Sequence, residues 1–210
     1  MKKVFLIGLV GLLCYSCSSK AKDETKVNNN SVNEVLQELP APPFEKWKFK
    51  NLSYELSDDY YQGKKVIKVF RNDLTKPYGT VAFPNVKLDY AGGKYRISII
   101  VKKANHSNEF AFRIQELYPV RTDVVFDLDS ISVKDMYKVE DITDFEEAEI
   151  EDVGEGFYRC SFTSEIFASY LNLQIGPCIT SNHIKSWEAI HKKKAEIFVV
   201  PETLKIEEVK

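Results

Sequence analysis

Four planar polar side chains recur at alternate positions of two extended segments. Arg113 and Gln115 alternate with apolar residues in one segment, and Asn172 and Gln174 do so in another. Alternate residues of a strand point to the same face of a sheet, so adjacent strands would gather these four groups on one surface. Guanidinium and amide groups form directed hydrogen bonds, and the sequence therefore predicts a candidate sugar-binding face. The alternative is that they are ordinary solvated positions of half-exposed strands.

Three further candidates lie in or near predicted loops, where binding residues concentrate. Tyr118 and Arg121 follow the Arg113 segment, and Trp187 lies nearer the end of the chain. An aromatic ring can stack on a sugar ring, although most tyrosines of a β-sandwich cap its core instead. These three residues complete the predicted ligand-binding set.

Acidic residues are concentrated before and within one predicted hairpin. They are Asp141, Asp144, Glu146, Glu147, Glu149, Glu151 and Asp152. Glycoside hydrolysis needs two carboxyl groups that converge on the scissile bond, whereas a run of charges is usually a solvated face. No lyase or hydrolase motif accompanies the run. We therefore predict that the chain is not an enzyme, with a glycan lyase or hydrolase as the alternative.

Two cysteines, Cys160 and Cys178, follow the N-terminal region. In an oxidising compartment they could form one disulfide, and two buried free thiols are the alternative, because a disulfide needs a short distance between Cα atoms. Together with His106, His183 and His191 they lack the close paired spacing of zinc ligands. No metal site and no cofactor is predicted from these residues.

The charge of the chain excludes one class of partner. The formal net charge is −2, and nucleic-acid binding normally needs a basic face. Neither a G-x-G-x-x-G nor a P-loop pattern is present.

Alternation of apolar and polar residues with period two dominates the chain and must position these side chains. Tyr95, Ile97, Ile99 and Val101 alternate with polar residues and are interrupted only by Ile100. The same alternation occurs at residues 110–115, 124–128, 148–150, 158–162, 171–175 and 197–199. Weaker candidates for strands lie at 52–56 and 66–71. Within residues 44–210, a helix is considered only for 186–194. Strands without crossover helices favour an antiparallel sandwich or barrel.

One predicted hairpin carries a family resemblance. The segment from Ala148 to Thr163 reads A-E-I-E-D-V-G-E-G-F-Y-R-C-S-F-T. It resembles the I-x-D-V-G-x-G-W-Y-R-C-S-x-T hairpin of carbohydrate-binding-module-like jelly-roll domains, found in phage tail proteins and beside glycan-degrading enzymes, with Phe157 in place of the usual Trp. Gly154 and Gly156 would allow the positive φ values of a tight turn. The strand that follows would point Tyr158, Cys160 and Phe162 into the core, and Arg159 and Ser161 to the outer face.

The resemblance implies a galactose-binding-like, antiparallel jelly-roll β-sandwich of about eight or nine strands. It spans roughly residues 44–201 and includes the segments Phe44–Trp47, Tyr95–Lys103 and Val125–Leu128. Most relatives are non-catalytic. The resemblance makes polysaccharide a candidate partner, and such domains often hold one structural calcium ion. Function lies in sites carried by a fold, so the ligand itself is not implied.

The N-terminus has the plan of a secretory signal. Met1-Lys2-Lys3 precedes an apolar run, Val4–Leu13. A helix needs roughly 20 apolar residues to span a bilayer, so this run is too short for a transmembrane helix. Cys17, with Ser16 before it and two serines after it, resembles the lipobox of bacterial lipoproteins, although Cys14 and Tyr15 occupy places usually held by Leu and a small residue. An ordinary secreted protein cleaved near Ser19 is the alternative.

These features divide the chain into three regions. Residues 1–16 are the predicted lipoprotein signal peptide, 17–43 a lipidated flexible tether with a short helix considered at 31–39, and 44–210 the jelly-roll domain. We expect a protein anchored to the outer membrane through its N-terminal lipid, facing the periplasm or the cell surface. A glycan-binding module is the favoured function, and a structural or adhesive envelope protein is a further alternative.

Overall fold

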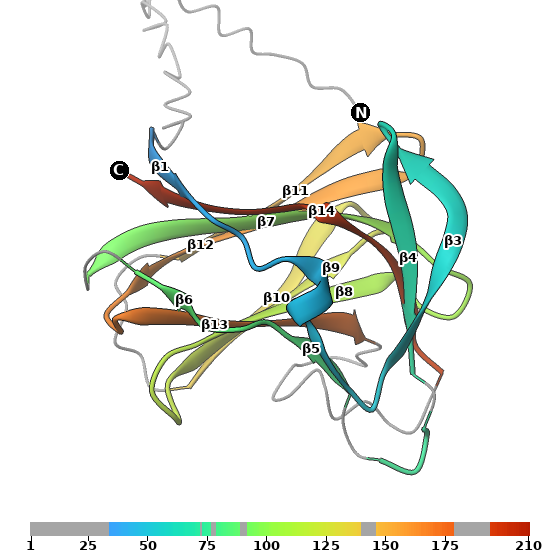
Figure 1. Ribbon diagram of the computed structural model, residues 1–210, viewed down its shortest axis with the longest axis horizontal. Coiled ribbons are helices and arrows are strands. Elements are labelled where there is room, and N and C mark those ends of the chain that lie inside the picture. Colours follow the sequence, from blue (N-terminus) through green and yellow to red (C-terminus); the bar gives the residue numbers. More distant parts are fainter. Residues whose placement is uncertain (1–33, 72, 77–78, 89–91, 140–145, 179–193) are drawn as a thin grey trace, which may run out of the picture. The chain divides into compact units, whose positions relative to one another are not determined.

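The computed structural model describes residues 34–210 except 72, 77–78, 89–91, 140–145 and 179–193 (Figure 1). The predicted signal peptide, Cys17 and Trp187 lie outside the described residues, as does most of the helix considered at 186–194. Residues 33–210 form one compact unit, and residues 1–32 are divided from it. Within the described part, no helix is long and apolar enough to span a membrane.

The described residues form two antiparallel sheets packed face to face. The first sheet has the order β11 (Glu146–Gly154), β12 (Phe157–Ile166), β7 (Gly93–Lys103), β14 (Glu196–Val209), β4 (Lys64–Phe70) and β3 (Ser53–Tyr61), and β1 (Val35–Leu39) also pairs with β14. The second has the order β10 (Ser132–Val139), β9 (Arg121–Asp127), β8 (Glu109–Gln115), β13 (Tyr170–Cys178), β5 (Thr80–Ala82) and β2 (Lys48–Lys50), and β6 (Val86–Lys87) also pairs with β13. A single 3₁₀ turn, η1 (Phe44–Lys46), is described between β1 and β2. The predicted all-β jelly-roll sandwich is confirmed.

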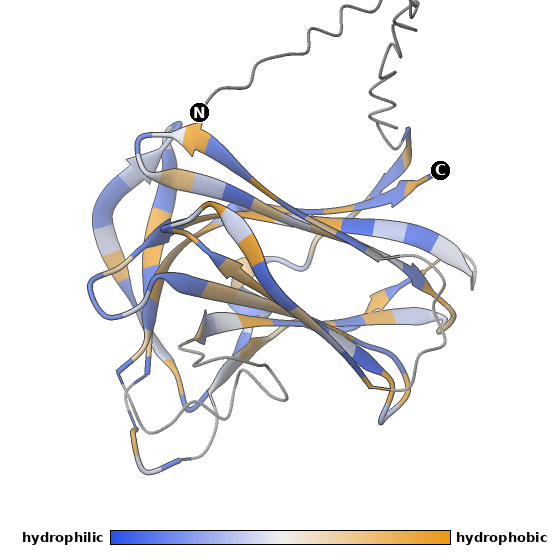
Figure 2. Cartoon of the chain, turned by 180° about the vertical axis from the view of Figure 1, so that it is seen from behind, coloured by the Kyte–Doolittle hydropathy of each residue, from blue (hydrophilic) through white to orange (hydrophobic). Residues whose placement is uncertain are grey.

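Strands that the alternation predicted have their apolar faces in one shared core. Phe110, Phe112 and Ile114 of β8 lie in it opposite Cys160 and Phe162 of β12. Apolar and polar residues alternate along the strands in Figure 2. Each face of a strand therefore has a different environment, and the polar face of each sheet is left on the outside.

The structure explains why the apolar residue Ile100 interrupts the alternation of β7. It lies on the outer face of the first sheet in a small apolar cluster with Tyr61, Phe157 and Val200. The turn between β11 and β12 has the predicted geometry, because Gly154 has φ 90° and Gly156 has φ 75°. Both are left-handed conformations that favour glycine.

Short strands account for most of the difference between the predicted and described strand numbers, and β10 is the one longer strand that was not predicted. Fourteen strands are described instead of about eight or nine, and four of them (β1, β2, β5 and β6) have five residues or fewer. A segment that short contains too few alternations to be recognised from period two alone.

The first strand lies inside the region predicted as tether. Residues 35–39 pair with the end of β14, with Val35 opposite Val209 and Leu39 opposite Ile206. The helix considered at 31–39 is therefore wrong for these residues, and the sheet begins before Phe44. The free edge of β14 provides backbone hydrogen-bond partners that local sequence cannot reveal.

Of the two alternatives that the sequence left open for the cysteines, the structure has the two buried free thiols. Cys160 and Cys178 are both free and fully buried. Cys160 belongs to β12 in the first sheet and Cys178 to β13 in the second. The two strands are consecutive in sequence, but the chain crosses between the sheets, so the cysteines are not cross-strand neighbours.

Candidate functional site

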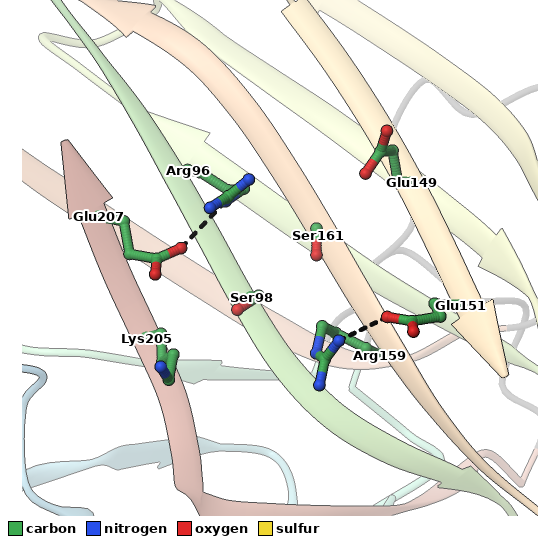
Figure 3. Close-up of a pocket in the computed structure, with 8 residues that line it drawn as sticks. All are labelled: Arg96, Ser98, Glu149, Glu151, Arg159, Ser161, Lys205 and Glu207. Carbon is green, nitrogen blue, oxygen red and sulfur yellow. Dashed lines mark hydrogen bonds and ion pairs between the residues drawn. The ribbon is translucent and has the colours of Figure 1, made fainter. Parts of the chain in front are cut away.

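An open polar groove lies on the outer face of the first sheet, over β11, β12, β7 and β14 (Figure 3). Its volume is about 360 Å³. We call it the polar groove, and its lining consists of Arg96, Ser98, Glu149, Glu151, Arg159, Ser161, Lys205 and Glu207. The groove therefore presents three cationic and three acidic side chains around two hydroxyls.

Strand register explains the hollow. Glu149 lies opposite Ser161, Ser161 opposite Ser98, and Ser98 opposite Lys205, so these four residues form one row across four strands. The two small side chains occupy the middle of the row, and the long charged ones stand at its ends, as Figure 3 shows. Because a row of cross-strand neighbours shares one face, the serines form a floor between two charged walls.

The floor is recessed but remains open toward the groove. Ser98 is 6% exposed and Ser161 8%. Among the described residues, neither hydroxyl has a hydrogen-bond partner. A hydroxyl both donates and accepts, so the floor retains hydrogen-bonding capacity for a ligand.

Two ion pairs hold the walls in place. Arg96 donates from Nε to Glu207 at 2.9 Å, and Arg159 donates to Glu151 at 2.5 Å. Lys205 lies 3.5 Å from Glu38 of β1. Because paired side chains lose less conformational freedom when a ligand arrives, these contacts favour a preformed site.

A second hollow of about 210 Å³ adjoins the polar groove and shares Ser98, Arg159 and Lys205 with it. It extends past Tyr61 and the Gln62 turn to Glu202 and Thr203. The register of β14 shifts between Val200 and Lys205, and there the Thr203 hydroxyl accepts from the Ile100 backbone N–H at 2.9 Å and donates to the Val200 carbonyl at 2.6 Å. This bulge turns the strand and lengthens the depression across the face.

The four residues predicted to share a face do lie together, on the outer side of the second sheet. Gln115 is directly opposite Asn172, and Arg113 is directly opposite Gln174. The three amides are half-buried. Arg113 is only 5% exposed, which makes it a poorer ligand contact than the sequence suggested.

An acidic residue on β9 explains the burial of Arg113. Asp123 is fully buried and accepts from Arg113 at 2.6 and 2.9 Å and from Arg121 at 3.2 Å. Arg121 therefore joins the predicted cluster, whereas Tyr118, 82% exposed, lies at the end of the sandwich in the loop between β8 and β9. Sequence analysis did not select Asp123, because an acidic side chain in a strand usually points to solvent. Ligand binding by the predicted set stays a prediction.

The polar groove was also missed by sequence reasoning. Arg159 and Ser161 were expected on the outer face, but the strands beside them could not be identified without the topology. The available signal was the pair of serines among long charged residues in β7 and β12.

Metal ligands are not gathered in the described part of the chain. There, no group of three or more His, Cys, Asp or Glu side chains could hold a metal ion. The structural calcium ion implied by the resemblance stays a prediction, because calcium also binds backbone carbonyl and side-chain amide oxygens.

Comparisons with known proteins find likeness only at the level of solved structures, and several of these match. No family model matches the chain, and no curated protein matches it. Among solved structures, the chain is similar to the CBM22-1 xylan-binding domain of Xyn10C from Paenibacillus barcinonensis, with 13% identity and a TM-score of 0.45. The match covers 85% of this chain and 96% of that domain.

Proposed function

We propose that this chain is an envelope-anchored, non-catalytic lipoprotein that binds a polysaccharide in the polar groove. The observation that carries the proposal is the recessed floor of Ser98 and Ser161 between walls of carboxylate and guanidinium groups. Sugar hydroxyls need donors and acceptors in fixed positions, and these side chains supply both.

Binding without catalysis agrees with the openness of the groove. A glycosidase requires a general acid that is shielded from water so that it stays protonated. Glu149 and Glu151 are exposed, and Glu151 and Glu207 are each paired with an arginine. This arrangement supports a recognition surface that leaves its ligand intact.

The groove can be tested on a glycan array with the fragment 33–210, which contains both sheets and the shared core. Ser161→Trp should fill the hollow, and Glu149→Ala with Arg159→Ala should remove one wall; each should weaken binding roughly tenfold or more, about 1.4 kcal/mol. Glu55→Ala with Lys68→Ala is the matched control, because it removes a 2.5 Å ion pair between β3 and β4 of the same sheet, outside the groove lining.

Two outcomes would contradict this site. Unchanged affinity in the groove variants, with loss on Gln115→Ala or Gln174→Ala, would move binding to the second sheet. Absence of binding to every plant, algal and host polysaccharide tested would reject the glycan-binding function.

The membrane anchor has its own test. We expect mass spectrometry of the mature protein to find an acylated N-terminal Cys17, and Cys17→Ser to release the protein from the membrane fraction. An unmodified terminus that begins after Cys17 would reject lipidation. It would leave the glycan experiment unaffected.

A further inference from the structure

Exposed apolar side chains gather at one end of the sandwich. Among the described residues, nine large hydrophobic side chains are exposed, and five of them are Val35, Leu36, Leu117, Tyr118 and Phe167. Leu117 is 67% exposed and Tyr118 82%. Apolar side chains this open to water in a cluster mark a contact surface more often than scattered single ones do.

Strand register places these residues at the same end. Val35 pairs with Val209, and Val209 pairs with Lys94 at the start of β7. The neighbouring Gly93 pairs with Ile166, the residue before Phe167. The start of β1, the end of β14 and the turn between β12 and β13 therefore lie on one side, as both ribbon views show (Figures 1 and 2).

A hydrogen bond joins the second sheet to this end. The Phe167 backbone N–H donates to the Glu116 carboxylate at 3.2 Å. Glu116 immediately precedes Leu117 and Tyr118, so the loop between β8 and β9 lies beside the loop that carries Phe167. We call the surface of Val35, Leu36, Leu117, Tyr118 and Phe167 the apolar end.

The chain outside the sandwich enters at the same place. The Lys210 backbone N–H donates to the Glu34 carbonyl at 3.0 Å, which fixes the N-terminal entry point next to the C-terminus. Sixteen residues, 18–33, separate Glu34 from Cys17. Even fully extended, a chain of this length reaches at most about 60 Å, so a lipid on Cys17 would keep this end of the sandwich within that distance of the bilayer.

We propose that the apolar end rests on the membrane surface, with Leu117, Tyr118 and Phe167 at the level of the lipid headgroups. The proposal rests on the membrane anchoring proposed above. Aromatic and leucine side chains favour the membrane interface, and a tether raises the effective concentration of a contact too weak to hold alone. The strands then stand steeply on the bilayer, and the polar groove on the side of the sandwich remains open to a polysaccharide.

Site-specific fluorescence can test this orientation without acylation. The fragment 33–210 carries an N-terminal hexahistidine tag, which tethers it to phosphatidylcholine–phosphatidylglycerol vesicles containing a nickel-chelating lipid. An environment-sensitive NBD dye is attached through Tyr118→Cys at the apolar end or, as the matched control, through Glu155→Cys in the exposed β11–β12 turn at the opposite end of β7. Cys160 and Cys178 are fully buried, so they should not take up the dye in the folded protein.

We expect the emission at position 118 to shift to the blue and rise roughly twofold or more on tethering, while position 155 stays unchanged. Leu117→Ser with Phe167→Ser should abolish the change at position 118. Equal responses at the two positions, or a larger one at position 155, would overturn the proposal. Because the nickel tether replaces the lipid and no glycan is present, these outcomes are independent of whether Cys17 is acylated and of whether the groove binds sugar.

Discussion

At the scale of single residues, the buried carboxylate of Asp123 is the group whose burial costs most unless it is compensated. Its two arginine partners approach from β8 and from β9 itself, at 2.6 and 3.2 Å. Burial of a charge is costly unless hydrogen bonds and an opposite charge compensate for it. Arg113 is thus primarily a structural residue, and substituting it tests stability more directly than ligand binding.

Removal of that arginine should destabilise the fold. We expect Arg113→Ala to lower the free energy of unfolding by about 3–5 kcal/mol, because Asp123 loses its bidentate partner. Arg113→Met combined with Asp123→Leu should recover most of this loss. Urea unfolding of the three proteins, with the half-buried Gln115→Ala as control, measures both effects. A single variant as stable as the wild type would contradict the structural role.

Glu116 adds a pH dependence to the fold. Burial raises the pKa of its carboxyl, against hydrogen bonds from the Ala168 and Phe167 backbones that lower it. The folded state therefore holds this proton more tightly than the unfolded state, so the stabilisation is present at low pH and lost as the pH rises through the folded pKa.

The uncharged Glu116→Gln variant checks this sign. Its free energy of unfolding, measured relative to wild type, should increase between pH 4 and pH 7. Urea midpoints at both pH values, with the exposed Glu155→Gln as control, give the comparison. A relative stability that decreases with pH would show that the hydrogen bonds outweigh burial.

At the scale of elements, β1 extends the sandwich beyond the domain boundary that sequence predicted. Its last residue, Leu39, is 5% exposed and belongs to the shared core. Lys205 in the polar groove also contacts Glu38 of this strand. β1 therefore contributes both to stability and to the wall of the groove.

A fragment that begins at Phe44 should be less stable than one that begins at Asn33. Leu39→Ala alone should cost about 2 kcal/mol or more, and the truncation additionally removes the pairing with β14. Urea unfolding of both fragments measures the difference, and Leu36→Ala, which changes an exposed residue of the same strand, is the control. Equal stability of the two fragments would show that β1 is dispensable.

At the scale of the whole molecule, one core joins the two sheets. Trp47 packs there against Phe83 with ring centroids 4.5 Å apart, and its indole N–H donates to the Pro42 carbonyl at 3.0 Å. Strands of both sheets contribute to the same buried cluster. Neither sheet can lose its partner without exposing that cluster, so the sandwich should unfold as a unit.

We expect the fragment 33–210 to show one unfolding transition in urea, with the same midpoint by far-UV circular dichroism and tryptophan fluorescence. Phe112→Ala, which changes a fully buried core residue of β8, should shift both midpoints together by a similar amount. Separate midpoints would mean that the sheets unfold independently.

The local pattern of apolar, polar and glycine residues predicted most of the fold. The alternation in β7, β8 and β12 predicted which residues enter the core, and Gly154 and Gly156 predicted the turn between β11 and β12, because side-chain direction and backbone sterics are local properties. The strands Val35–Leu39 and Thr80–Ala82 escaped prediction, since each forms through pairing with a distant strand.

The candidate site divides in the same way. Sequence by itself determined that Arg113 and Gln115, Asn172 and Gln174, and Arg159 and Ser161 point outward, since period two orients neighbouring side chains. Only the tertiary structure decided that Asp123 buries Arg113 and that Ser161 lies between Glu149 and Ser98. It also decided that the apolar loops lie beside the entry of the chain at Glu34. Each of these contacts joins residues of different strands or loops, and strand order and register, which local sequence does not encode, bring them together.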